Sequence, residues 1–79
     1  MDRDVATIVT TAVTYSISHL AELVPFLKEN CEPETYKTFL DAISHAIYET
    51  GLVRECVFDR FPDIKEAMET RLNKYGRLC

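Results

Sequence analysis

The sequence predicts an all-α protein, a small single-domain bundle of three to five helices spanning residues 1–79. Apolar residues recur at helical spacing in several segments, and prolines and glycines are few and stand where helices begin, bend or end. No segment combines a strand pattern with a hairpin turn and a partner strand. A content of 47% hydrophobic and 28% charged residues is typical of a globular chain.

The first expected helix begins near Asp2 or Asp4, whose short carboxylates suit an N-terminal cap. Apolar residues then follow the three-and-four spacing of one helical face up to Leu27, with Ser16 as the main interruption. Pro25 lacks a backbone N–H and disfavours helical geometry in the residue before it. We therefore expect a long first helix that is kinked or broken near Pro25.

A strand is the competing interpretation of residues 13–18, because they alternate between apolar and polar and are rich in β-branched side chains. A helix is favoured because two adjacent pairs, Ile8 with Val9 and Thr10 with Thr11, break the alternation. A lone strand would also lack a pairing partner elsewhere in the chain.

Proline and glycine place the remaining elements. A second helix with proline at its first position is expected over residues 33–50, and Gly51 is expected to stop it. A short third helix follows over residues 52–61, and a last helix over residues 62–75 ends at Gly76. The short connections predict neighbouring helices that pack antiparallel or at steep angles.

Net charge and cysteine content restrict the partners and the cellular compartment that we expect. A net charge of −4, spread without long runs of like charge, disfavours nucleic acid and anionic lipid as partners. Three dispersed cysteines indicate a reducing compartment, and with no visible signal peptide we expect the cytoplasm. Residues 5–21 carry no charged side chain, but threonine and serine dilute them below a membrane span.

The most specific metal hypothesis rests on two pairs of side chains one helical turn apart, His19 with Glu22 and His45 with Glu49. Bundle metal sites use Glu-x-x-His with further glutamates from other helices, and those ligands are not identifiable here. Ordinary polar pairs are the favoured interpretation. No metal ligand set, no cofactor and no catalytic residue is therefore predicted, and convergence of the two pairs on a metal stays an open alternative.

A thiol enzyme is a further alternative, because Cys31, Cys56 or Cys79 would need only a histidine base to act as a nucleophile. Nothing in the sequence marks any of them, and Cys56 falls in an apolar stripe that favours a core position. Phosphate-binding loops are excluded by the two isolated glycines. We therefore expect a non-enzyme.

A nucleic-acid-associated regulator is the second function considered, because Arg71, Lys74 and Arg77 make the C-terminal end basic. The helix after Gly51 offers few free cations, and basic residues at a helix C-terminus also complement the helix dipole. Nucleic acid is therefore the less favoured partner.

The leading hypothesis is a non-enzymatic protein-interaction module, a small homodimeric regulator, adaptor or inhibitor. It rests on the first helix, whose apolar band is wide and whose other face carries threonine and serine instead of charges. No small-molecule substrate and no membrane partner is expected. The expected partner or dimer interface consists of Val5, Ile8, Val9, Ala12, Val13, Ile17 and Leu20.

Overall fold

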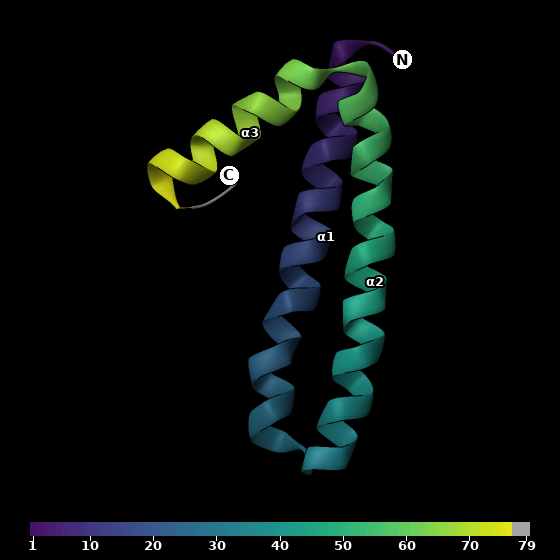
Figure 1. The fold of residues 1–79 in the computed structure, drawn as a ribbon, viewed down its shortest axis with the longest axis vertical. Helices are drawn as coiled ribbons and strands as arrows, with labels where there is room; N and C mark the ends of the chain where they lie inside the picture. The colour runs from purple at the N-terminus through teal and green to yellow at the C-terminus, as the bar shows by residue number, and fades with distance from the viewer. Residues whose placement is uncertain (77–79) are drawn as a thin grey trace.

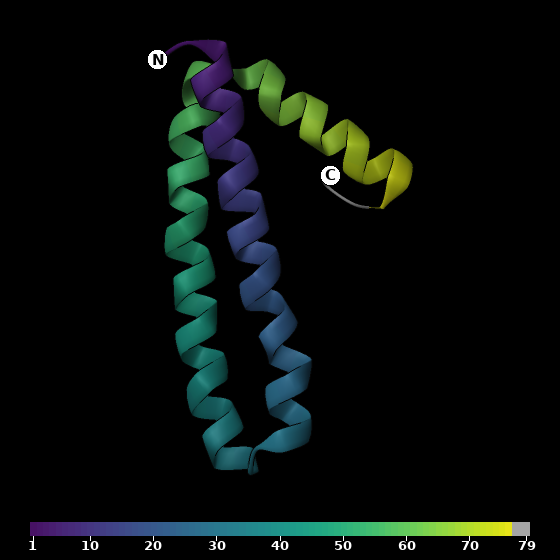
Figure 2. The ribbon, with the colours of Figure 1, turned by 180° about the vertical axis from the view of Figure 1, so that it is seen from behind.

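The computed structural model describes residues 1–76, which form three α-helices and no strand. Helix α1 spans Arg3–Asn30, α2 spans Pro33–Arg60 and α3 spans Pro62–Tyr75. In Figure 1, α1 and α2 lie side by side as an antiparallel hairpin, and α3 leaves the end of α2 at a steep angle. The view from behind shows the same arrangement (Figure 2), so the prediction of an all-helical fold is confirmed.

The signals predicted for the start of α1, for the starts of α2 and α3 and for the end of α3 are found where they were expected. The Asp2 carboxylate caps α1 by accepting a hydrogen bond from the Val5 N–H at 2.8 Å. Prolines occupy the first positions of α2 and α3, where the missing N–H costs no intrahelical bond. Gly76 ends α3 with a positive φ of 70°, and its N–H donates to the Leu72 carbonyl at 2.8 Å.

Pro25 does not break the first helix, because α1 continues through it to Asn30. A proline inside a helix removes one hydrogen bond to the preceding turn. Apolar residues that face α2 continue on both sides of it, at Leu20, Val24 and Leu27, and none of these three is exposed. Packing on α2 therefore holds the segment helical despite the missing bond.

The prediction that Gly51 stops a helix is wrong, and so is the separate short helix over residues 52–61. Both segments belong to the continuous helix α2. Glycine costs a helix only about 1 kcal/mol relative to alanine. Residues facing α1 continue across it, from Ile47 to Arg54 and Val57, and their packing outweighs that cost.

The helical hairpin is held by a narrow apolar seam with strict three-and-four spacing on both helices. Every seam position is buried or half-buried. Helix α1 contributes Ala6, Thr10, Val13, Ile17, Leu20, Val24 and Leu27. Helix α2 contributes Tyr36, Leu40, Ile43, Ile47, Thr50, Arg54 and Val57, and Phe61 follows directly after its last residue. The register resembles an antiparallel coiled coil that turns back at residues 31–32.

Helix α3 packs against the open end of the hairpin, opposite the loop at residues 31–32. Met68 is its buried residue, and Phe58 of α2 is buried with it. Arg3 at the start of α1 forms an ion pair with Asp63 in the first turn of α3, and its guanidinium lies 5.3 Å from the Phe61 ring centroid. Among residues 1–76, no helix has both the length and the apolar character needed to cross a bilayer.

Replacing Gly51 by alanine should stabilise the protein. A Cβ at this position meets no atom within 4 Å, and the residue is helical, so only the conformational freedom of the unfolded chain changes. We expect Gly51→Ala to raise the free energy of unfolding by about 0.5–1 kcal/mol. Urea denaturation followed by circular dichroism measures it, and a destabilised variant would contradict a continuous α2.

The ion pair that joins α1 to α3 should respond to acid. The hydrogen bond from the Arg3 guanidinium lowers the pKa of the Asp63 carboxyl below its usual range, so its contribution is present near neutral pH and is lost as the pH falls through that lowered pKa. Wild type should therefore melt at a higher temperature than Asp63→Asn at neutral pH, and the two melting temperatures should converge in acid. An equal difference at both pH values would contradict this account.

Candidate protein-interaction surface

The hairpin has two sides, one on each side of the seam, and α3 packs against only one of them, at the open end. Thr14 of α1 and Phe58 of α2 mark the α3 side, and both are buried. Towards the loop, this side becomes small and polar or basic, with exposed Ala21, Lys28, Lys37 and Ser44. No described helix lies along the opposite side, which we call the open flank.

The open flank carries a stripe of mainly apolar side chains. The seam pattern repeats every seven residues on each helix. The residues that directly precede every second seam residue therefore lie in a row along one edge of the seam, which forms a stripe. On both helices this stripe is dominated by apolar side chains. The next row outward on α1 is also largely apolar, with His19 as the exception. The next row on α2 is mixed, because Ala42 shares it with Thr35, Glu49 and Cys56. The flank consists of Val5, Val9, Ala12, Ser16, Leu23 and Phe26 from α1 and Phe39, Ala42, Ala46 and Val53 from α2.

Several large side chains of the open flank are strongly exposed. Leu23 is 44% exposed, Phe39 is 48% exposed, Val53 is 49% exposed and Phe26 is 60% exposed. Scattered apolar residues are normal on protein surfaces, whereas an apolar strip shared by two helices is a candidate interaction site.

Side-chain size differs between the loop end, the middle and the open end of the open flank. The loop end carries the bulky residues Leu23, Phe26 and Phe39. The middle carries small ones, with Ser16 on α1 and Ala46 on α2. The open end carries residues of intermediate size, chiefly valines at positions 5, 9 and 53. The strip is therefore narrow at its centre and widens towards the loop.

The structure distributes the seven expected interface residues over three environments. Val13 is buried, and Ile17 and Leu20 are half-buried in the seam with α2. Val5 and Ala12 are exposed on the open flank, with half-buried Val9 beside them. Ile8 is 67% exposed on the outer face of α1, away from α2.

Sequence analysis missed the contribution of α2 to this surface. Phe39, Ala46 and Val53 recur every seven residues, one position before the seam residues Leu40, Ile47 and Arg54. The predicted stop at Gly51 hid this repeat, because Val53 was assigned to a different helix. A search for a second apolar stripe beside the first would have found it.

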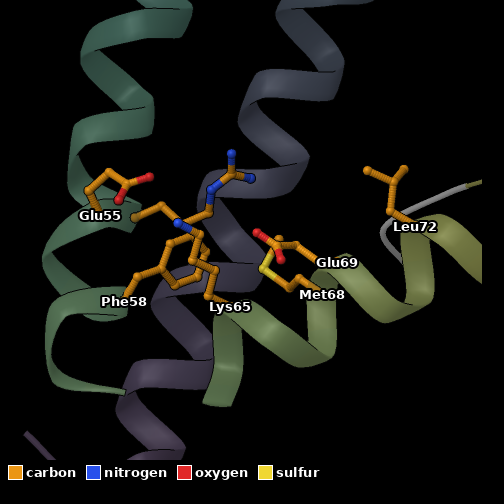
Figure 3. Close-up of a pocket in the computed structure, with 7 residues that line it drawn as sticks. Glu55, Phe58, Lys65, Met68, Glu69 and Leu72 are labelled. Atoms are coloured by element: carbon orange, nitrogen blue, oxygen red, sulfur yellow. The ribbon is translucent and has the colours of Figure 1, made fainter. Parts of the chain in front are cut away.

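A recess lies between α2 and α3. Its volume is about 220 Å³, and Figure 3 shows Phe58 and Glu55 of α2 facing Met68, Glu69 and Lys65 of α3 across it. The remaining residues that line it are Arg54 and Leu72. Ligand pockets usually enclose about 300–1,000 Å³. The recess is smaller than that, and its lining carries charges of both signs.

Arg54 makes a polar layer in the seam beside this recess. Its Nη1 donates to the Thr14 hydroxyl at 3.2 Å, and the same hydroxyl donates to the Thr10 carbonyl at 2.8 Å. The Arg54 Nε and the Thr10 hydroxyl are buried without a hydrogen-bond partner. Among residues 1–76 no carboxylate pairs with Arg54, whose guanidinium lies 5.8 Å from the Phe58 ring centroid.

The residues considered for metal or thiol chemistry are spread over the hairpin surface. His19, Glu22, His45 and Glu49 are all exposed, and no three potential ligands gather within residues 1–76. Cys56 is exposed on α2, so its predicted core position is wrong. It lies one residue before the buried seam residue Val57, in the same seven-residue series as Ala42 of the open flank. Cys79 lies outside the described residues.

The basic end is only partly described. Arg71 and Lys74 are exposed on α3, and Arg77 lies outside the described residues. Arg71 lines a shallow depression together with the acidic residues Asp63 and Glu66. The Lys74 ammonium lies 5.3 Å from the Tyr75 ring centroid. The described part of α3 therefore interleaves basic and acidic side chains.

Removing the guanidinium of Arg54 from the polar layer should change the free energy of unfolding only a little. Arg54→Met keeps the long apolar stem but removes a guanidinium with a buried, unpartnered N–H, and such replacements are often neutral or stabilising. We expect the free energy of unfolding to change by less than about 1 kcal/mol. Urea denaturation measures it, with Arg54→Lys as the control. A larger loss in Arg54→Met that Arg54→Lys does not share would mean that the charge is needed for stability.

The chain matches no protein-family model, no curated protein and no solved structure. Its function is therefore inferred from its own residues and their geometry. The feature on which this inference rests is the mainly apolar open flank.

Proposed function

We propose that this chain is a non-enzymatic protein-interaction module, a small regulator, adaptor or inhibitor, whose docking surface is the open flank. The observation that carries the proposal is the apolar strip shared by α1 and α2, which includes Leu23, Phe39 and Val53. Covering such surface removes apolar area from water, which favours association by about 25 cal/mol for each Å² buried. A helical partner surface fits best, because the strip is long and narrow.

The shape of the chain supports this proposal. Its Cα radius of gyration is 14.8 Å, whereas a compact domain of this length has about 11.6 Å. A single layer of two long helices leaves each helix with one packed edge and one open edge. In a helical bundle, the open edges are covered by further helices.

The interface proposed here differs from the seven residues expected from sequence. Val13, Ile17 and Leu20 pack in the seam, so the docking surface we propose uses Val5, Val9 and Ala12 of that set together with flank residues of α2. We place the module in the cytoplasm. The unpaired thiols of Cys31 and Cys56 are compatible with a reducing compartment.

Partner capture with matched variants tests the proposal. Phe39→Glu introduces a charge on the open flank, and Tyr48→Glu introduces the same charge on the same helix away from that flank. Tyr48 is 66% exposed and borders a recess on the opposite side of the seam, beside Ile47 and Gly51. The tagged full chain, either variant and wild type are compared in affinity capture from native lysate. We expect Tyr48→Glu to retain the proteins captured by wild type and Phe39→Glu to lose them at least tenfold.

Circular dichroism serves as the folding control for both variants, because both positions are exposed and both should keep wild-type helicity. Capture of the same proteins by all three chains would contradict the flank as a docking surface. Loss of capture in Tyr48→Glu alone would assign docking to the face of α2 that carries Tyr48.

A further inference from the structure

The molecule exposes more surface than a compact chain of its mass. Its accessible surface is 5918 Å², whereas a folded monomer of 9.1 kDa exposes about 4,900 Å². The excess is roughly 1,000 Å², and a standard protein interface buries about 800 Å² on each partner. One interface of ordinary size would therefore bring the chain to the burial of a compact domain.

We propose that the open flank pairs with the open flank of a second copy, in antiparallel orientation, to form a symmetric four-helix bundle. This inference rests on the proposed function and names its partner. The two-fold axis crosses the flank at its middle, so that α1 packs on α1 of the second copy and α2 packs on α2.

Side-chain size favours the antiparallel arrangement. It seats the bulky loop end of each flank on the valine-lined open end of the other, with Leu23 against Val9 and Phe39 against Val53 of the second copy. The small residues Ser16 and Ala46 meet their own counterparts at the axis, where the helices approach most closely. A parallel arrangement would stack Leu23 on Phe39 at the loop end and valine on valine at the other, which leaves uneven spacing between helices.

Charge at the two ends of the flank is complementary in the same arrangement. Arg60 ends α2 at the open end, and Glu32 precedes α2 at the loop end, in the same seven-residue series as Phe39. Pairing the open end with the loop end brings Arg60 of each copy to the level of Glu32 of the other. Within the described residues Arg60 has no ion pair, and its Nη1 donates to the Cys56 carbonyl at 3.3 Å.

Helix α3 does not obstruct this pairing. It packs on the opposite side of the hairpin, where Phe58 and Met68 are buried against each other. In the bundle, the two copies of α3 therefore project from opposite ends and from opposite outer faces. The recess between α2 and α3 remains accessible in each copy.

Mass in solution and one cysteine cross-link test the proposal. Sedimentation equilibrium of the full chain should give twice the 9.1 kDa chain mass, and Val53→Glu should give the monomer mass while Tyr48→Glu remains a dimer. In a chain with Cys31, Cys56 and Cys79 replaced by serine, Ser16→Cys should form a disulfide-linked dimer under mild oxidation. Ser44→Cys, exposed on the α3 side, should not.

A monomeric wild type over the whole concentration range would overturn the second copy as the occupant. If Phe39→Glu still lost its captured proteins, the interaction module would stand with another protein on the flank. If it lost none, the proposed function would fail as well. A dimer in which Ser16→Cys stays unlinked, or in which Ser44→Cys links equally, would overturn the antiparallel flank pairing.

Discussion

The packing of α1 on α2 along one narrow seam is the interaction on which the other features of this chain depend. The seam repeats every seven residues on both helices, so each helix commits a single stripe to its neighbour. Packing along this repeat keeps α1 helical through Pro25 and α2 helical through Gly51. At both positions the residue type itself disfavours a helix. Two long helices with one shared stripe result, and such a pair leaves an edge on either side.

The two edges of the hairpin carry different side chains, and this difference defines the candidate surface. On one edge α3 covers the apolar residues near the open end, and towards the loop that edge carries small and basic side chains. Between these two parts lies a recess whose lining includes Ile17, Ile47 and Tyr48. On the other edge Leu23, Phe39 and Val53 continue the apolar character along the whole hairpin. A chain of this size buries a modest share of its surface, so an uncovered apolar edge has a large effect on its stability. Association through that edge is the physical link between the fold and the proposed function.

Much of the fold was predictable because helix ends depend on local chemistry. The Asp2 cap, the prolines that open α2 and α3, and the left-handed Gly76 follow from single residues and their neighbours. The continuity of α2 was not predictable from Gly51 itself, because the decision lies in packing against α1. Likewise, the stripe of Phe39, Ala46 and Val53 has meaning only once the hairpin shows which edge α3 covers. Periodicity alone placed Val13 and Leu20 in an interface without showing that the partner is α2 of the same chain.

Radical footprinting of the full chain at high and low concentration tests the central claim, that the open flank is covered in solution. If two copies pair through the open flank, Phe26 and Phe39 are protected at high concentration and gain reactivity on dilution. Tyr48, which lies away from the flank on α2, reacts equally at both concentrations. Phe26 and Phe39 that react at both concentrations as freely as their exposure in the single chain allows would contradict it.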